Sequence, residues 1–389
     1  MNKKEGEIKM ANLTTPFRYD YVGSFLRPEK LKKARADFEA GEITREQLKE
    51  VEDACILELV AKIKELGYHV ITDGEFRRAT WHLDFMWGFD GIEHKKTVDG
   101  NTTFDGEAAM IDDTFMVGKI SVKNHPFVDH FKFVKALEDE NTIAKQTVPS
   151  PAQFYAYFTG AELLDTTLEI YGTEEAFAED VIKSYGEFID EIYAAGCRNL
   201  QFDDCVWGGL VNPKLAVALT GRRGEALEEY KKVILALNNK VVEEAPADLT
   251  INTHVCRGNY HSTFFSSGAY DGVADLLFGE ENVNAYYLEL PIMGAARFNV
   301  ADNTNLVVNA GPYFACGIAG KTKIAGESVK TFSDDGVDFK RFDAGLGVGV
   351  ALEFGRIIAG LDGQFGLVDV QKLGNPKNMN FSIVVGYKF

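Results

Sequence analysis

The sequence predicts an α/β chain in two parts: an incomplete (βα)8 TIM-type barrel of six strand-helix units, then an antiparallel all-β segment of about five strands. Residues 1–290 alternate short β-branched runs with helical apolar stripes, whereas residues 291–389 alternate apolar with small or polar residues. Charge changes at the same place. Residues 291–389 hold 10 Lys and Arg against 9 Asp and Glu, while the whole chain holds 41 against 59. A domain boundary is therefore expected near residue 290.

Within the first part, apolar spacing and breaker residues place each element. Gly67 and Gly196 end two helical stripes, as glycine commonly does just past a helix C-terminus. The connection over 76–141 is long and aromatic-rich, and either a substrate cover or an accessory packing layer fits it. The expected strands cover 19–25, 68–73, 142–147, 197–202, 249–256 and 284–288. The expected helices cover 29–38, 44–66, 174–195, 225–243 and 272–278.

Composition narrows the class of partners. The net charge of −18 disfavours nucleic acid and anionic membrane surfaces. The five cysteines are odd in number and show no paired framework, which suits a reducing compartment, and Cys197 and Cys205 fit small core positions. The N-terminus shows no apolar signal region, and no 18-residue apolar run occurs. A cytoplasmic protein is the expectation.

The pair His254 and Cys256 ends the fifth expected strand. Residues i and i+2 of a strand point to the same side, so the imidazole and the thiol can reach one ion. Zinc is the metal that such nitrogen and sulfur ligands favour. The alternative is a buried cysteine beside a histidine that is hydrogen-bonded to backbone.

Polar residues also end the other expected strands, where (βα) barrels place their working residues. Glu75 could be functional or could form a surface ion pair with the arginines that follow it. Asp203 and Asp204 are adjacent, so their side chains diverge. Asp203 is expected to face the barrel mouth, and the other carboxylate could cap a helix. Gly23 and Ser24 form either a plain turn or a pair of backbone N–H donors for a carboxylate.

With these motifs in order, residues from about 15 to 289 resemble the catalytic domain of cobalamin-independent methionine synthase. The resemblance implies His254, Cys256 and Glu289 as zinc ligands. It also implies that Tyr155 lies near the methyltetrahydrofolate. The amino-acid end of homocysteine would be held by Gly23, Ser24, Glu75 and Asp203. The segments that carry it are VGSFLRP at 22–28, TDGEFR at 72–77, LQFDD at 200–204, THVCRGN at 253–259 and YLE at 287–289.

The family pattern is interrupted after Glu289. The family needs two further barrel strands with an acid histidine and a second cysteine ligand, but no histidine follows His261 and the later cysteine is Cys316. The folate-side carboxylate of the family aligns with Gly209, so the methyl donor stays open.

Residues from about 286 to 389 instead resemble the last strands of a small porin-like outer-membrane β-barrel. Runs of about ten residues alternate apolar with small or polar side chains at 306–318, 342–354 and 378–389, which is typical of such barrels. A chimeric chain is therefore suspected. A soluble antiparallel sheet joined to the enzyme is the alternative.

The predicted function is zinc-dependent methyl transfer from methyltetrahydrofolate, or a related donor, to homocysteine. Two alternatives stay open. One is a uroporphyrinogen decarboxylase-like or corrinoid-dependent methyltransferase on the same fold, and the other is a non-enzymatic outer-membrane barrel protein. Membrane association is not expected without a signal peptide.

Overall fold

A computed structural model describes most of the chain as two compact units, Met1–Leu277 and Phe278–Phe389. The division falls before the predicted boundary at residue 290. The described residues are 20–97, 102–104, 107–109, 111–258, 265–268, 270–282, 286–291, 294–301, 303–319, 321–324, 327–330, 342–355, 357–368 and 379–387.

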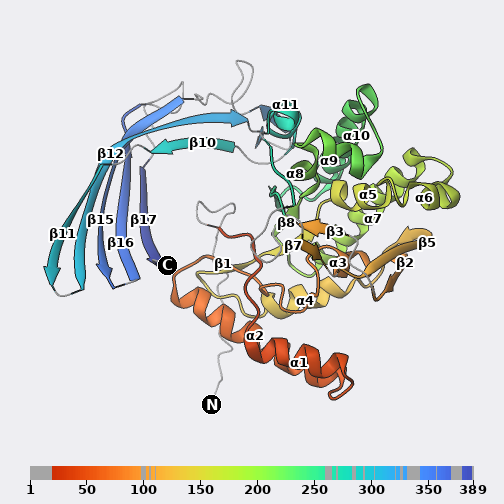
Figure 1. Cartoon of the computed structure of the whole chain (residues 1–389), viewed down its shortest axis with the longest axis horizontal. Coiled ribbons are helices and arrows are strands. Elements are labelled where there is room, and N and C mark those ends of the chain that lie inside the picture. Colours follow the sequence, from red (N-terminus) through yellow and green to blue (C-terminus); the bar gives the residue numbers. More distant parts are fainter. Residues whose placement is uncertain are drawn as a thin grey trace, which may run out of the picture. The chain divides into compact units, whose positions relative to one another are not determined.

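Short parallel strands lie at the centre of the first unit (Figure 1). β1 pairs with β6, and β7, β8 and β9 pair in that order, all parallel. Every residue of β7 and β8 is buried, as expected of parallel strands covered on both faces. The strands are β1 (Val70–Ile71), β6 (Ile143–Ala144), β7 (Gln146–Pro149), β8 (Asn199–Asp203) and β9 (Thr250–His254). They confirm four of the expected strands, while the closed barrel remains a prediction.

The strand expected at 19–25 is wrong for its described part, because residues 20–28 form no strand. Hydrogen bonds between side chains and backbone carbonyls take the place of a backbone ladder there. The Tyr21 hydroxyl donates to the Val70 carbonyl at 2.6 Å, and the Gln201 amide donates to the Val22 carbonyl at 2.8 Å. Gly23 has φ of 122°, a conformation that glycine adopts without steric cost. The segment is thus held by specific polar contacts and not by strand pairing.

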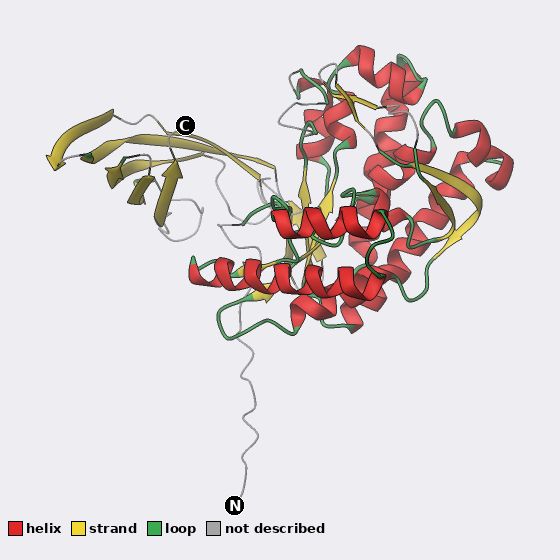
Figure 2. Ribbon diagram, turned by 60° about the horizontal axis from the view of Figure 1, so that its bottom comes forward, coloured by secondary structure: helices red, strands yellow, loops and turns green. Residues whose placement is uncertain are grey.

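Helices surround these strands, and five of them match the predicted helices: α1, α2, α7, α10 and α11. Thr44 and Gln47 form a capping box at the start of α2, and Thr173 caps α7. Figure 2 shows α1 and α2 side by side. The helices are α1 (Glu29–Glu39), α2 (Arg45–Glu65), α3 (Leu83–Met86), α4 (Pro126–Lys135), α5 (Pro151–Phe158), α6 (Leu164–Tyr171), α7 (Glu174–Ala194), α8 (Val206–Leu210), α9 (Pro213–Thr220), α10 (Glu225–Glu244) and α11 (Asp271–Gly279).

The long connection over 76–141 contributes to the core of this unit. Its helices α3 and α4 bury Phe85 and Phe127, and an antiparallel pair of strands, β2 and β5, lies between them in sequence. This supports the packing-layer interpretation for the two helices. The strands of the connection are β2 (Asp90–Lys95), β3 (Thr102–Phe104), β4 (Glu107–Ala109) and β5 (Asp113–Ser121).

The second unit is built on an antiparallel sheet of six strands, in the order β10, β12, β15, β16 and β17. The sixth strand, β11, pairs with β12. Its strands are β10 (Tyr286–Pro291), β11 (Gly294–Ala301), β12 (Thr304–Ala319), β15 (Phe342–Phe354), β16 (Ile357–Gly366) and β17 (Met379–Tyr387), beside a separate hairpin of β13 (Lys321–Ile324) and β14 (Glu327–Lys330). The expected antiparallel segment is confirmed. The sixth parallel strand is wrong, because β10 pairs antiparallel with β12, whose 16 residues offer it a continuous edge.

The described side chains of β15 reverse the usual polarity of a soluble sheet. Leu346, Val348 and Val350 are exposed, whereas the glycines between them are buried. On the opposite side, Glu353 is buried and forms an ion pair with Arg297, with 2.8 Å between the carboxylate Oε1 and the guanidinium nitrogen. Apolar side chains on one face and polar ones on the other are typical of membrane-barrel strands.

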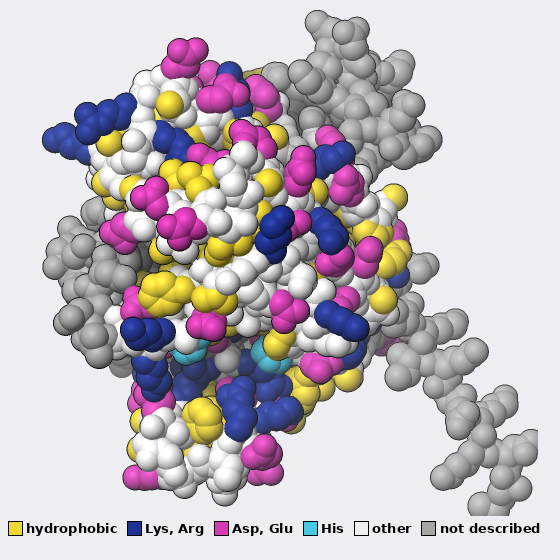
Figure 3. Space-filling view, turned by 90° about the vertical axis from the view of Figure 1, so that its right-hand side faces the viewer, with side chains coloured by type: hydrophobic (Ala, Val, Ile, Leu, Met, Phe, Trp, Pro, Cys, Tyr) yellow, Lys and Arg dark blue, Asp and Glu magenta, His cyan; other side chains and the backbone are white. Residues whose placement is uncertain are grey.

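The face drawn in Figure 3 carries interspersed acidic and basic side chains, with apolar side chains between them. Among the helices of the described part, none is both long and apolar enough to cross a lipid bilayer.

The aromatic cluster around Phe85 yields a stability prediction. The ring centroid of Phe85 lies 5.0 Å from that of Phe188 and 5.4 Å from that of Phe127, and the Phe85 side chain is fully buried. Truncation to alanine leaves a cavity, so Phe85→Ala is expected to lower the free energy of unfolding by about 3–5 kcal/mol. Urea denaturation followed by near-ultraviolet circular dichroism measures it. Leu57→Ala, at a side chain 46% exposed, is the control, and equal losses in both variants would contradict this packing.

Candidate functional site

Three predicted site residues, Asp203, His254 and Cys256, lie where β8 and β9 end. The two strands pair in register, so Asp203, the last residue of β8, lies opposite His254, the last residue of β9. The backbone N–H of Asp204 continues the pairing by donating to the His254 carbonyl at 2.8 Å. The carboxylate and the imidazole therefore leave neighbouring strands at the same level.

Asp203 and His254 form an ion pair, with 3.0 Å between the carboxylate Oδ1 and the imidazole Nδ1. The same oxygen accepts from the Gln201 amide at 2.7 Å. Burial lowers the pKa of His254, but the hydrogen bonds to Asp203 and Cys256 outweigh it and raise the pKa to about 9. Asp203 thus fixes both the orientation and the charge of the imidazole.

Cys256 lies beside a second thiol that the sequence did not indicate. The Sγ atoms of Cys205 and Cys256 are 3.1 Å apart, and the Gly258 N–H points at the Cys256 sulfur from 3.4 Å. The Cys205 thiol and the His254 imidazole both favour the thiolate and lower the pKa of Cys256. Cys205 is therefore not the core residue that its sequence suggested, whereas Cys197 is fully buried as expected.

Glu75 is buried, with only 2% of its surface exposed, so the alternative of a surface ion pair is wrong. Its carboxylate lies 3.3 Å from the Arg78 guanidinium and 3.3 Å from the Thr147 hydroxyl. Burial raises the pKa of Glu75, Arg78 counteracts this, and the nearby Asp203 raises the pKa further. The backbone of Glu75 has φ of 59°, a strained conformation for a residue with a side chain. Such strain is common at functional sites.

The segment with Gly23 and Ser24 is tied to Glu75 by Arg27. The Arg27 guanidinium donates to the Ser24 hydroxyl at 3.0 Å and to the Glu75 carbonyl at 2.9 Å. A side chain at position 23 would come within 2.8 Å of the Thr147 methyl group, so glycine is needed for this close approach. The structure therefore joins Gly23, Ser24 and Glu75 in one cluster.

Asp204 points elsewhere, as its divergence from Asp203 predicts. It does not cap a helix. Its buried carboxylate accepts from the Trp207 indole at 3.0 Å and from the Asn238 amide at 2.6 Å. Burial outweighs these hydrogen bonds and raises the pKa of Asp204 to about 6.

Tyr155 is not part of this cluster by its described contacts. The Tyr155 side chain is buried against Phe177, and its hydroxyl donates to Glu174 at 2.9 Å. Glu289 lies in β10 of the second unit, opposite Ala315, and its side chain is outside the described residues. The roles of both residues stay predictions.

Several members of the cluster were missed from the sequence: Arg27, Arg78, Thr147, Gln201 and Cys205. Arg27 and Gln201 lie inside the segments 22–28 and 200–204 that carry the family resemblance, next to predicted site residues. The position of Arg78 three residues after Glu75 was the available signal for their ion pair, whereas nothing local distinguishes Thr147.

The donor chemistry at the strand ends fits zinc. Asp203 engages Nδ1 of His254, so Nε2 is the nitrogen that would bind a metal, the arrangement that usually orients a metal-binding histidine. Cys256 supplies a thiolate. In the described part of the chain, however, no group of three or more His, Cys, Asp or Glu side chains is arranged to hold a metal ion.

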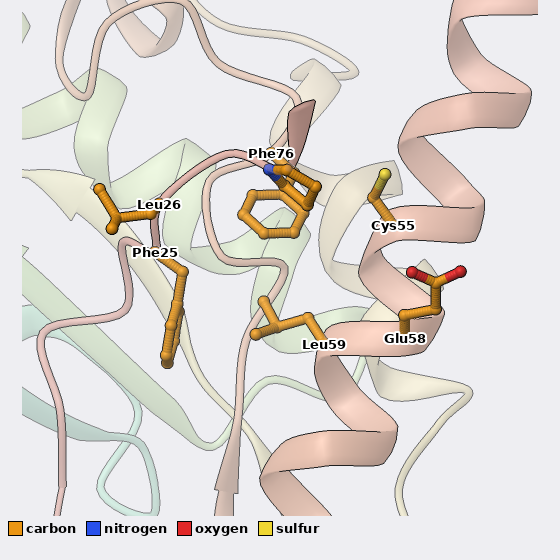
Figure 4. A pocket seen from close by; sticks show the side chains of 7 residues that line it. Phe25, Leu26, Cys55, Glu58, Leu59 and Phe76 are labelled. Carbon is orange, nitrogen blue, oxygen red and sulfur yellow. The ribbon is translucent and has the colours of Figure 1, made fainter. Parts of the chain in front are cut away.

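A separate apolar pocket of about 370 Å³ lies between the 25–28 segment and α2 (Figure 4). Its lining includes Phe25, Leu59 and Phe76, with the Cys55 thiol and the Glu58 carboxylate at its edge. No predicted site residue lines it.

Comparison with known proteins bears on both parts of the chain. The uncharacterized proteins YxjG and YxjH of Bacillus subtilis are each 36% identical over 274 residues, which covers 70% of this chain and 70% of each relative. The crystal structure of a putative vitamin-B12 independent methionine synthase from Listeria monocytogenes is 34% identical, with a TM-score of 0.53, and the match covers 70% of this chain and 72% of that one.

The chain belongs to the cobalamin-independent methionine synthase family. The methionine synthase of Sulfolobus acidocaldarius is more distant, at 24% identity over 247 residues and 61% of each chain. The family resemblance predicted from the sequence motifs is confirmed.

A second family also matches. Residues 248–372 fit the model of an outer membrane protein beta-barrel domain, a region that begins just before β9 and ends after β16. This confirms the other predicted resemblance, and a methionine synthase-like part followed by a membrane-barrel-like part is consistent with a chimeric chain.

The ion pair of Asp203 and His254 yields a pH prediction for the metal-free protein. A histidine whose folded-state pKa is raised stabilises the fold fully below its ordinary pKa of about 6.5, and this contribution is lost as pH rises through about 9. Asp203→Asn should therefore lower the His254 pKa and cost stability at pH 6 but progressively less toward pH 9 and above. NMR titration and urea denaturation measure the two effects.

Asp129→Asn is the matched control, because this exposed carboxylate pairs only with a surface lysine among its described contacts. The control should leave the pH dependence unchanged. A His254 pKa that stays the same in Asp203→Asn would show that the ion pair does not govern it.

Proposed function

We propose that the first unit is a zinc-dependent methyltransferase that moves a methyl group from 5-methyltetrahydrofolate, or a related donor, to the thiol of homocysteine, giving methionine. The observation that supports this most is the juxtaposition of His254 and Cys256 at a strand end, with the imidazole oriented by Asp203. A nitrogen donor at the end of a strand and a sulfur donor two residues beyond it suit zinc.

His254 and Cys256 would hold the metal, and the family resemblance implies Glu289 as a third ligand. Zinc, when bound, lowers the pKa of a substrate thiol so that the sulfur is a nucleophile at neutral pH. Asp203 would keep the imidazole in the tautomer whose Nε2 is free, through the hydrogen bond to Nδ1.

Glu75 and Asp203 would bind the ammonium group of homocysteine. Both carboxylates belong to one buried cluster, where charge-assisted hydrogen bonds are stronger than in water. The backbone N–H groups of Gly23 and Ser24 would take the substrate carboxylate. Holding both ends of the amino acid would fix the thiol against the methyl donor.

The sulfur would then displace the folate N5 nitrogen from the methyl carbon, forming one S–C bond as one N–C bond breaks. No residue is assigned as the proton donor to the departing nitrogen, because no histidine follows His261. Tyr155 on the folate side, and a cytoplasmic location, remain part of the proposal.

A second candidate function applies to the second unit, which would act as a set of membrane-facing strands. The outer-membrane barrel match and the exposed apolar face of β15 support it. It is compatible with a chimeric chain in which the first unit is an enzyme.

The zinc proposal predicts metal loss in Cys256→Ser. The reduced wild-type chain is expected to bind about one zinc, measured by mass spectrometry of the metal, and to methylate homocysteine when supplied with methyltetrahydrofolate. Cys256→Ser should lose most of the zinc and the activity, because a thiolate ligand is removed. Asp203→Asn should weaken zinc binding by about 10- to 100-fold.

Cys55→Ala is the control, since Cys55 lies in the separate pocket. Zinc that persists undiminished in Cys256→Ser would count against the site. Zinc content without methyl transfer from folate would favour another methyl donor.

The membrane-strand proposal predicts that the full chain needs detergent. Without detergent we expect it to aggregate through the exposed apolar face of β15, and Val348→Glu with Val350→Glu should reduce this aggregation. Sedimentation with and without a mild detergent measures it. A wild-type chain that is monomeric without detergent would refute the proposal.

A further inference from the structure

The closest approach of two cysteines in the described chain is that of Cys205 and Cys256, whose sulfur atoms are 3.1 Å apart. A disulfide bond is about 2.05 Å long, so the two atoms need to approach by only about 1 Å to be joined. Both thiols are reduced in this structure and both are partly exposed, whereas Cys55 and Cys197 are buried.

The strand register explains the proximity. β8 and β9 pair with a constant offset, from Asn199 opposite Thr250 to Asp203 opposite His254. Cys205 and Cys256 each follow two residues after that last pair. Neighbouring strands are about 4.8 Å apart, within the roughly 4.4–6.8 Å that separates the Cα atoms of disulfide-bonded cysteines.

The surrounding chain keeps the two segments in contact beyond the strands. Asp204 donates its backbone N–H to the His254 carbonyl, and Gly208 packs so closely on the Cys256 carbonyl that a side chain at position 208 would collide with it. Ser266 also hydrogen-bonds to the Gly208 carbonyl. The two cysteines are therefore positioned by backbone contacts and not by flexible side chains alone.

We propose that Cys205 and Cys256 are a reversible oxidation site, which closes to an intramolecular disulfide when the metal-free protein meets a low-molecular-weight disulfide such as oxidised glutathione. One cysteine thiolate attacks the glutathione disulfide, which forms a mixed disulfide and releases one glutathione thiolate. The second cysteine thiolate then attacks the protein sulfur of that mixed disulfide and releases the other glutathione. The two protein thiols are oxidised, and one glutathione disulfide is reduced to two glutathione molecules.

The functional consequence rests on the proposed function. If Cys256 is a zinc ligand, the disulfide removes its thiolate and excludes the metal, and bound zinc in turn protects Cys256 from oxidation. The disulfide itself requires only the two thiols.

The test uses the full chain, stripped of metal and treated with oxidised glutathione at pH 8. We expect the loss of two titratable thiols, a Cys205–Cys256 linked peptide in non-reducing peptide mapping, and full recovery with dithiothreitol. Cys205→Ser and Cys256→Ser should give no linked peptide, and the remaining cysteine should carry glutathione. Cys55→Ala should still form the link. Glutathione accumulating on Cys256 of the wild-type chain, or both thiols staying free, would overturn the proposal.

A zinc titration of the reduced chain separates the two proposals. A linked peptide in a chain that binds no zinc would support the oxidation site and overturn the zinc methyltransferase. Zinc binding in a chain that never forms the link would support the zinc site and overturn the oxidation site. Preloaded zinc that slows formation of the link at least 10-fold would support both.

Discussion

The in-register pairing of β8 with β9 is the constraint on which the site depends. It sets Asp203 opposite His254, and the segments that continue from these strands set Cys205 beside Cys256. Two buried, parallel strands hold these side chains more rigidly than loops would. One backbone arrangement thus produces both an oriented imidazole and a close pair of thiols.

A buried network of opposite charges completes the site. Arg27 and Arg78 surround Glu75, while Asp203 is engaged by His254 and Gln201. Burying an unpaired charge costs free energy, so these partners are needed for the Glu75 and Asp203 carboxylates to be buried in ionised form. The strained backbone at Glu75 is tolerated because contacts on both sides determine its position.

The two units follow opposite rules of burial. In the first unit, apolar residues fill the interior around parallel strands, and charged residues cover the helices. In the second unit, the described face of β15 turns apolar side chains outward and small residues inward. This change in which side chains are exposed is consistent with two families joined in one reading frame, as the two family matches indicate.

The sequence by itself determined five of the described helices, four of the expected strands and the identity of several site residues, because apolar periodicity and strand-end polar residues are local signals. It also identified His254 and Cys256 as a pair, since their spacing alone places them on one side of a strand. Only the tertiary structure decided the partners of these residues. Cys205 is 51 positions from Cys256. The segment where a strand was expected at 19–25 is held instead by hydrogen bonds between Tyr21 and Val70 and between Gln201 and Val22. Likewise the strand expected at 284–288 pairs antiparallel with β12 and not with a parallel strand. Such contacts depend on register between distant segments, which no local pattern encodes.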